Sequence, residues 1–509
     1  MLAKILSSAV IGIDAYVVEV EVDIAQGLPA FSTVGLAEGA VRESKDRVKT
    51  SIKNSGYHFP SDRITVNLAP ADIKKEGSAF DLPMALGILA ATGLIPHASY
   101  QDHLFLGELS LDGLIRPIKG ALPIAITAKD KGLRGIFLPA ENATEAAVVE
   151  EIPVYPVRNL CQLVEALIGL NPIEAFHLDP TQVFQEPEHQ VDFSDVHGQE
   201  NVKRAMEIAA AGGHNLIMMG PPGAGKTMLA KRLYTILPEL NFQEALETSK
   251  VYSVMGMMPK GAGLIKVRPF RSPHHTVSDI GLIGGGPNPR PGEVSLAHNG
   301  VLFLDELPEF KKNALEVLRQ PLEDGAVTIT RANATVTYPA NFMLVAAMNP
   351  CPCGFLGDPK RDCSCTYTQI QRYRSKISGP LMDRIDIHMD VPAVPFKDLS
   401  STQPSESSAQ ILTRIKSARR LQAERFQKMK VYTNAGMSSR HIRKFCEIDQ
   451  ESNHLLERAM EKFALSARAH SRILKIARTI ADLEGSVAIK APHVAEAIQY
   501  RTLDRRVVK

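Results

Sequence analysis

The feature that most constrains this sequence is NLIMMGPPGAGKTMLAKRL, from Asn215 to Leu233. It contains Gly-x-x-x-x-Gly-Lys-Thr, placed after an apolar run typical of a strand and before a run typical of a helix. Glycines let backbone N–H groups turn inward around phosphates, and the start of the following helix favours negative charge. The pattern predicts a phosphate-binding loop rather than a glycine-rich turn without a ligand. The predicted loop consists of Gly220, Pro221, Pro222, Gly223, Ala224, Gly225, Lys226 and Thr227.

Two side chains of this loop and two from a later strand are expected to act on the nucleotide. Lys226 should reach the β- and γ-phosphates of ATP, and Thr227 should bind Mg²⁺. The run NGVLFLDELPEF then supplies an apolar strand that ends in Asp305 and Glu306. We expect Asp305 to hold Mg²⁺ through water and Glu306 to orient and deprotonate the attacking water. Alone, such a pair would be an ordinary solvated acidic turn, but beside a phosphate loop it predicts hydrolysis.

The next apolar strand, FMLVAAMNP, ends at Asn349. An amide at this position can hydrogen-bond the attacking water or the γ-phosphate, although an Asn-Pro pair is also a common turn. A strand ending in Asp-Glu followed by one ending in Asn favours the first role. Apolar strands alternate with helical patterns from Val191 to about Pro392, which indicates a parallel sheet covered on both faces.

Length and composition set the wider limits. The chain has 509 residues, too many for one hydrophobic core, so we expect about three domains. Its formal charge of +2 neither requires nor excludes a nucleic-acid partner, and any DNA-binding surface must be local. No run approaches the roughly 20 apolar residues that span a bilayer, and Met84–Ile95 is better explained as a buried helix. The N-terminus passes into a period-2 strand pattern without a cleavage site, so we expect a cytoplasmic protein.

Changes in pattern divide the chain. Residues 1–170 alternate strands and helices, and residues 171–190 form a polar linker. Residues 191–395 are the predicted ATPase core, and residues 396–408 a Ser-rich hinge. Residues 409–509 are helical and rich in Arg and Lys.

The cysteines are concentrated in one place. Four of the six lie in NPCPCGFLGDPKRDCSC, within residues 349–366, as two Cys-x-Cys pairs. In a reducing compartment they are more often metal ligands than disulfides. Four thiolates suit one tetrahedral Zn²⁺, and an iron–sulfur cluster or buried free thiols are the alternatives. The candidate ligands are Cys351, Cys353, Cys363 and Cys365.

A basic stretch, QIQRYRSKISG, follows the cysteines. Arg372, Arg374 and Lys376 can neutralise phosphates, and Tyr373 can stack on a base. We hypothesise that this stretch and the cysteine loop contact DNA or the adjacent subunit. A solvated basic helix is the alternative.

Histidines precede the acidic pair. His274 and His275 could bind a metal, but a loop contact with DNA or a neighbour is the preferred interpretation. His298 is interpreted as a satisfied interior residue.

The order of these motifs resembles that of the AAA+ ATPases. SGPLMDRIDIHMDV resembles the family segment that carries an arginine finger, and the resemblance gives that role to Arg384. Such an arginine acts in trans on the nucleotide of the neighbouring subunit. The alternative is a surface arginine paired with Asp383 or Asp386.

LSARAHSRILKIARTIADL resembles the lid helix whose arginine senses nucleotide. The resemblance favours Arg468, with Arg472 in reserve. A solvated basic helix face is the alternative for both.

Two longer segments narrow the resemblance. Arg268–Phe310 and Gln369–His388 are similar to the magnesium-chelatase-like branch of AAA+ proteins, and specifically to the YifB/ComM family. This resemblance implies a homo-hexameric ATPase that acts as a DNA translocase or helicase. Its expected partners are single-stranded and branched DNA and recombination proteins, with branch migration in natural transformation, or competence, as its role. The alternative is a magnesium-chelatase-like protein-remodelling ATPase, against which the four-cysteine loop argues.

The resemblance implies an α/β fold with an AAA+ P-loop parallel-sheet core and a helical lid. A Lon-protease-like, ribosomal S5-like α+β domain should precede them. Lon catalysis needs a Ser nucleophile and a Lys base, but those positions fall on Ala79 and Leu122, with Ser78 and Lys119 nearby. We therefore expect a Lon-like fold without peptidase activity, an ATP-dependent protease being the alternative.

Overall fold

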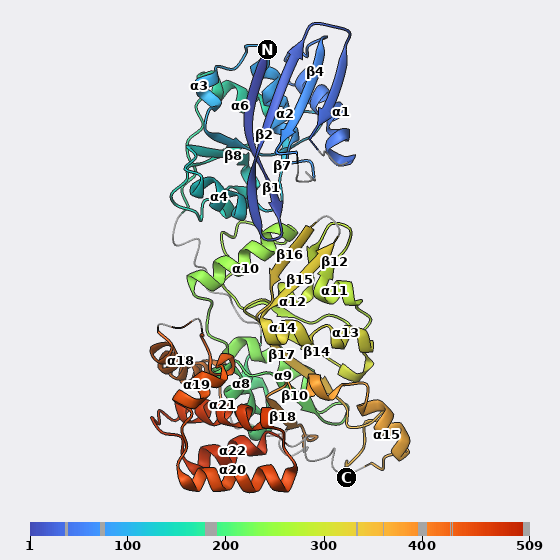
Figure 1. Ribbon diagram of the computed structural model, residues 1–509, viewed down its shortest axis with the longest axis vertical. Helices are drawn as coiled ribbons and strands as arrows, with labels where there is room; N and C mark the ends of the chain where they lie inside the picture. Colours follow the sequence, from blue (N-terminus) through green and yellow to red (C-terminus); the bar gives the residue numbers. More distant parts are fainter. Residues whose placement is uncertain are drawn as a thin grey trace. The chain divides into compact units, whose positions relative to one another are not determined.

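The computed structural model describes residues 1–35, 39–71, 77–178, 191–331, 334–359, 361–394, 405–427, 429 and 431–501. The chain divides into two compact units, unit 1 from Met1–Glu186 with Asn241–Lys266 and unit 2 from Pro187–Leu240 with Val267–Lys509 (Figure 1). Much of the predicted linker at 171–190 and of the predicted hinge at 396–408 lies outside the described residues.

Unit 1 is built on a seven-stranded sheet with the order β3-β4-β2-β1-β5-β8-β9. The strands of the unit are β1 (Leu2–Ile11), β2 (Asp14–Ala25), β3 (Ala30–Val34), β4 (Arg63–Ala69), β5 (His103–Phe105), β6 (Glu108–Leu109), β7 (Ile115–Arg116), β8 (Gly135–Pro139) and β9 (Val154–Val157). The helices are α1 (Gly39–Asn54), α2 (Asp81–Ala91), α3 (His97–Tyr100), α4 (Ala121–Asp130), η1 (Ala140–Asn142), α5 (Ala143–Ala146), α6 (Leu160–Leu167) and α10 (Phe242–Met255). The mixture of strands and helices confirms the predicted fold class.

The two long strands β1 and β2 at the centre of this sheet form a hairpin that the local sequence explains. β1 and β2 pair antiparallel from Leu2 opposite Asp23 to Ile11 opposite Asp14, and Gly12 turns the chain with φ +64°. The predicted N-terminal strand is therefore present. The buried helix predicted over Met84–Ile95 is present as α2, and every residue of α2 is buried, but the helix ends at Ala91 and residues 92–94 are exposed. Within the described part of the chain, no helix combines the length and apolarity that a bilayer crossing requires.

The segment Asn241–Lys266 belongs to unit 1, although the sequence placed it within the ATPase core. Its helix α10 packs on α4. The Gly120 N–H donates to Ser253 O at 3.0 Å, and the Lys250 ammonium pairs with Asp14. These are long-range contacts, which local periodicity does not encode.

Unit 2 contains a five-stranded sheet with the order β11-β14-β17-β10-β18, in which all neighbours are parallel. This confirms the predicted parallel core. Its strands are β10 (Leu216–Met219), β11 (Phe270–Arg271), β14 (Val301–Leu304), β17 (Met343–Met348) and β18 (Ile387–Asp390), with small pairs β12 (Gly284–Gly285) and β13 (Arg290–Pro291), and β15 (Ala326–Arg331) and β16 (Ala334–Pro339). The helices up to β18 are η2 (Phe193–Asp195), α8 (Glu200–Gly212), α9 (Lys226–Leu233), η3 (Tyr234–Ile236), α11 (Asp279–Ile283), α12 (Glu293–Leu296), η4 (Leu307–Glu309), α13 (Lys312–Glu316), α14 (Arg319–Asp324), α15 (Tyr367–Arg374) and α16 (Gly379–Met382).

The strand order positions the site. β17 lies between β10 and β14, and the carboxyl ends of parallel strands meet at one edge of a sheet. The phosphate loop follows β10, the acidic pair follows β14, and Asn349 follows β17. Three motifs that are far apart in the sequence are thereby neighbours.

Helices complete unit 2 after the sheet. They are α18 (Ser408–Arg425), η5 (Asn434–Gly436), α19 (Ser439–Phe445), α20 (Gln450–Phe463), α21 (Ala467–Leu483) and α22 (Ala491–Gln499). Ile415 of α18 and Ile473 of α21 belong to the same buried cluster as Leu216 of β10, so these helices and the sheet share one core. The Phe193 N–H donates to the Ser408 hydroxyl at 2.9 Å, which ties the start of α18 to the start of the unit.

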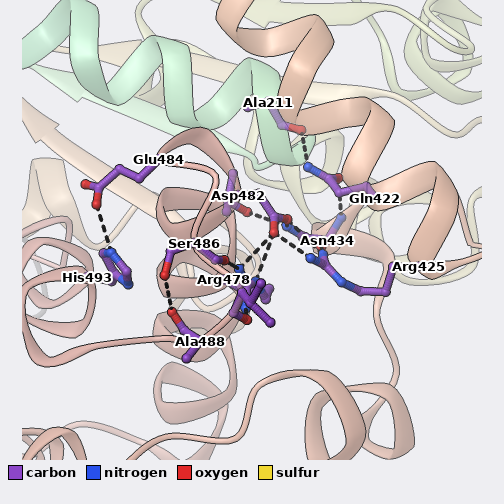
Figure 2. Close-up of polar contacts among 12 residues, drawn as sticks. Ala211, Gln422, Arg425, Asn434, Arg478, Asp482, Glu484, Ser486, Ala488 and His493 are labelled. Carbon is purple, nitrogen blue, oxygen red and sulfur yellow. Dashed lines mark hydrogen bonds and ion pairs between the residues drawn. The ribbon is translucent and has the colours of Figure 1, made fainter.

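A buried ionic cluster holds the C-terminal helices together (Figure 2). Asp482 is 2% exposed and accepts hydrogen bonds from Arg425, Asn434 and Arg478. Arg478 also donates to Val487 O at 2.7 Å. A buried carboxylate with this many donors stabilises the fold only while all partners remain.

Replacing Asp482 with alanine should lower the free energy of unfolding by about 3–5 kcal/mol, because two arginines lose their shared buried counterion. The midpoint of urea unfolding, followed by circular dichroism, measures this loss. Glu484→Ala is the matched control, since that carboxylate is 52% exposed and pairs with His493. The control should cost no more than about 1 kcal/mol. Equal losses in both variants would contradict the structural role of the Asp482 cluster.

Candidate nucleotide site and cysteine cluster

The phosphate loop leaves β10 at Met219 and enters α9 at Lys226. Gly223 and Gly225 have φ values of +78° and +85°, in the left-handed region that favours glycine. Gly220 has no space for a side chain, because an added Cβ would lie 2.1 Å from Val391 O. The glycines therefore set the loop path that the spacing predicted.

Lys226 is held at the centre of this loop. Its Nζ donates to Gly220 O at 2.7 Å, to Pro221 O at 2.9 Å and to Asn349 Oδ1 at 3.1 Å. The side chain is buried, and burial lowers the pKa of Lys226 against the opposing effect of Asp305. An ammonium with little water around it interacts strongly with a phosphate oxygen.

Thr227 and Asp305 face each other across the sheet edge. The Thr227 hydroxyl donates to Asp305 Oδ2 at 2.6 Å, and the Glu306 N–H donates to Asp305 Oδ1 at 2.9 Å. Hydroxyl and carboxylate oxygens are ligands that Mg²⁺ prefers. This pair has the donor set and proximity that an ATP-bound magnesium ion requires.

Glu306 adopts a constrained backbone conformation beside a histidine. Its φ is +51°, which is rare for a non-glycine residue and is typical of functional sites. His275 Nδ1 lies 3.3 Å from Glu306 Oε2, and the His275 ring lies 4.1 Å from that of His274. The sequence did not predict the contact between His275 and Glu306. The only available signal was the position of the His-His pair before the acidic strand.

Arg384 is bonded to none of these groups among the described residues. It is 6% exposed, its guanidinium pairs with Glu323, and Nη1 donates to Pro380 O at 2.6 Å. Among the described residues, its Nε has no hydrogen-bond partner. The two partners considered from the sequence, Asp383 and Asp386, are not the ones it contacts.

The two candidate sensor arginines differ in exposure. Arg468 is 62% exposed and lies 3.7 Å from Asp383, whereas Arg472 is bound to Asp386 and to Arg384 O. Arg472 and neighbouring cations keep the pKa of the buried Asp386 carboxyl well below its ordinary value, despite burial. Arg472 is therefore committed to a buried ion pair, whereas Arg468 is exposed and its ion pair with Asp383 lies at the surface.

The sulfur atoms of the four clustered cysteines lie within 4.8 Å of one another. Cys351 Sγ lies 3.4 Å from Cys353 Sγ and 3.6 Å from Cys363 Sγ, and Cys353 N–H donates to Cys365 Sγ at 3.3 Å. The sulfur–sulfur distances exceed the length of a disulfide bond. They approach roughly 3.8 Å, which is the sulfur–sulfur distance in a tetrahedral site with zinc–sulfur bonds of about 2.3 Å. The cluster fits a four-thiolate metal centre.

The cysteine loop packs against the phosphate loop. An added Cβ on Gly354, whose φ is +87°, would lie 2.5 Å from Pro222 Cδ. Pro350 O accepts hydrogen bonds from Arg374 at 3.3 and 3.2 Å. The cluster is thus fixed to both the phosphate loop and the end of β17.

The basic stretch is only partly available to a ligand. Tyr373 is 7% exposed, and burial raises its pKa to about 12, so the predicted stacking on a base is wrong for this residue. Arg374 is engaged with Pro350, and Lys376 pairs with Glu309 at 3.2 Å. Arg372 is exposed on the same helix, as is Tyr367, which is 67% exposed and was not singled out from the sequence.

Two other sequence interpretations concern buried or bonded side chains. His298 is buried and its Nδ1 accepts from the Asn341 N–H at 3.1 Å, which confirms an interior role. In unit 1, the Ser78 hydroxyl bonds to Glu108, and Leu122 is fully buried. The Ser78 hydroxyl therefore faces a carboxylate, and an apolar side chain occupies the expected Lys position.

Family models and similar proteins match this chain from its N-terminal part to its C-terminal helices. Three family models match the chain. The model described as "Magnesium chelatase, subunit ChlI" matches residues 192–399, and the model described as "Subunit ChlI of Mg-chelatase" matches residues 20–142. The model of the C-terminal part of magnesium chelatase subunit ChlI matches residues 405–501. The competence protein ComM of Haemophilus influenzae is 44% identical over 512 residues, covering 100% of this chain and 99% of ComM. The protein YifB of Escherichia coli is 43% identical over 509 residues, covering 100% and 98%. Lon protease 2 of Bacillus subtilis is 28% identical over 182 residues, 32% of each chain.

Proposed function

This chain belongs to the YifB/ComM family of magnesium-chelatase-like ATPases, and we propose from this premise that it couples ATP hydrolysis to the movement of branched DNA. The convergence of Lys226, Asn349 and the Thr227–Asp305 pair at one sheet edge carries the proposal. The name of the H. influenzae relative supports a role in competence. Residues 191–240 and 267–395 are then the ATPase core, since Asn241–Lys266 belongs to unit 1, and residues 409–509 are its helical lid.

Each side chain has a separate task in this proposal. Lys226 binds the β- and γ-phosphates, and Thr227 with Asp305 holds Mg²⁺, which neutralises phosphate charge when bound. Glu306 takes a proton from the attacking water. Asn349 orients that water or the γ-phosphate.

Subunits share the site in a homo-hexamer. Arg384 of one subunit stabilises the transition-state charge on the nucleotide of the next, for which it must leave Glu323. Arg468, exposed at the start of α21, senses the nucleotide. A mixture of Lys226→Ala and Arg384→Ala subunits should therefore regain hydrolysis at the sites that contain neither change.

We assign zinc to the cysteine cluster. Four thiolates in this geometry suit Zn²⁺, and the contact between Gly354 and Pro222 links the cluster to the nucleotide site. The exposed Arg372 and the loop beside it are then placed to move against DNA as the γ-phosphate is lost.

Changing Cys351 and Cys353 together to serine should remove the metal, because two of four ligands are lost. Elemental analysis of the reduced protein should give about one zinc per chain before the change and essentially none after it. Cys161→Ser and Cys446→Ser are the controls and should keep the zinc. Iron with acid-labile sulfide in the parent protein, or unchanged zinc in the double variant, would contradict the assignment.

The decisive test is the ATPase rate without DNA, with single-stranded DNA and with a branched junction. We expect stimulation by DNA and ATP-dependent movement of the junction, detected by separation of labelled strands. A protein-remodelling ATPase would instead be indifferent to DNA. Equal rates under all conditions, with no DNA bound, would overturn the proposed function while leaving the ATP site intact.

A further inference from the structure

Unit 1 contains a hollow of about 180 Å³ beside the edge of its sheet. Its walls come from α1, from Pro29–Phe31 at the start of β3, and from Phe59–Asp62 before β4. Among the described strands, β3 is the terminal one of the sheet, so none of the others in that sheet covers this side. This volume equals that of roughly six water molecules at about 30 Å³ each, which is comparable with the volume of one planar aromatic ring.

One face of α1 carries a line of positive charge along this hollow. Lys45, Lys49 and Lys53 line it at intervals of four residues, and all three are exposed. The helical rise places consecutive lysines about 6 Å apart along the axis. In the described part of the chain, none of the three forms an ion pair with a carboxylate, so their charge is available to a ligand.

Two aromatic side chains also line the hollow. Phe31 and Phe59 are half-buried and line the hollow, and the Lys49 ammonium lies 5.8 Å from the centre of the Phe59 ring. Asp62 is the carboxylate in the lining, and the three lysines outnumber it. Cations beside partly exposed aromatic rings match the chemistry of single-stranded nucleic acid, in which phosphates and unstacked bases alternate.

Duplex DNA fits this site less well. The bases of a duplex are paired and stacked on one another, so they cannot stack on the Phe31 and Phe59 rings without being unpaired. A simple anion would use the lysines but gain nothing from the rings. The combination therefore selects an unpaired strand.

We propose that this hollow is a binding site for single-stranded DNA, with Lys45, Lys49 and Lys53 on the phosphates and with Phe31 and Phe59 stacking on bases. The inference rests on the proposed function, since it names where a DNA-driven ATPase of this family holds an unpaired strand. It adds a contact on unit 1, separate from the nucleotide site.

Fluorescence anisotropy with a labelled oligo-dT tests the site in the full-length protein without ATP. Changing Lys45, Lys49 and Lys53 to alanine should weaken binding and reduce the slope of log affinity against log salt by about 2, at roughly 0.7 per lost phosphate contact. Phe59→Ala should weaken binding about five-fold or more with little change in that slope. Duplex binding should change less than oligo-dT binding in the Phe59 variant.

The control is a triple alanine variant at exposed lysines of unit 1 that do not line the hollow, namely Lys129, Lys131 and Lys260. Circular dichroism establishes that both triple variants are folded. The proposal is overturned if the Lys45/Lys49/Lys53 variant binds oligo-dT with the parent's affinity and salt slope, or no more weakly than the control. It is also overturned if Phe59→Ala is neutral. Neither result affects the ATPase measurement, so failure here is distinguishable from failure of the proposed function.

Discussion

Glu306→Gln is expected to bind ATP normally but to hydrolyse it about 10²- to 10⁴-fold more slowly than the parent protein. Glutamine keeps the shape of the side chain but has no carboxylate to accept a proton from water. The Glu306 side chain is 57% exposed, so the change does not disturb a packed core. Phosphate release gives the rate, and retention of labelled ATP on a filter shows the trapped complex.

Glu309→Gln is the matched control for this experiment. Glu309 lies in the same 3₁₀ turn, is also exposed and pairs with Lys376 at 3.2 Å, so its loss should change the rate less than about three-fold. Full turnover in Glu306→Gln would remove the assignment of the general base. It would also direct attention to His275, whose Nδ1 lies 3.3 Å from the Glu306 carboxylate.

The sheet edge of unit 2 could be predicted because it depends on local rules. An apolar run followed by a glycine-rich turn is a strand that leads into a phosphate loop, and parallel strands bring their carboxyl ends together. Those two rules were sufficient to bring Lys226, Asp305 and Asn349 within reach of one another. The observed contacts from Lys226 Nζ to Asn349 and from Thr227 to Asp305 agree with that expectation.

Other features depend on contacts between distant segments. Nothing in the periodicity of Asn241–Lys266 indicates that its helix packs on α4 of unit 1. Similarly, Arg384 was expected to pair, if at all, with a neighbouring aspartate, but its partner Glu323 lies 61 residues earlier. An ion pair of this kind depends on how α14 meets the segment that follows α16, which a motif does not record.

Burial also separates residues that look alike in the sequence. Tyr367 and Tyr373 both lie on α15, yet they are 67% and 7% exposed. The helix turns one tyrosine to solvent and the other to the backbone of Asn349. An amphipathic pattern is weak in eight residues, so the sequence could not tell which ring is available to DNA.

Gly354 of the cysteine loop packs on Pro222 of the phosphate loop, so the two loops are in direct contact. The sequence could predict only that the two loops leave the same edge of the sheet. A Cβ at position 354 would collide with the proline ring, so the loops fit together only with glycine there. A metal that rigidifies the cysteine loop would also restrict the phosphate loop. If either loop moved on ATP hydrolysis, the other loop would then have to move with it.

Lys226→Ala should abolish ATP binding and reduce hydrolysis at least about 100-fold, because no other cation is hydrogen-bonded within this loop among the described residues. Calorimetric titration with ATP measures the loss of binding. We expect the unfolding midpoint to change little, since burial, which lowers the Lys226 pKa, opposes the stabilisation from its three hydrogen bonds. Lys231→Ala, on the exposed face of the same helix α9, is the control and should bind ATP normally. If Lys226→Ala retained ATP affinity while the control behaved as the parent, the loop would not be the nucleotide site.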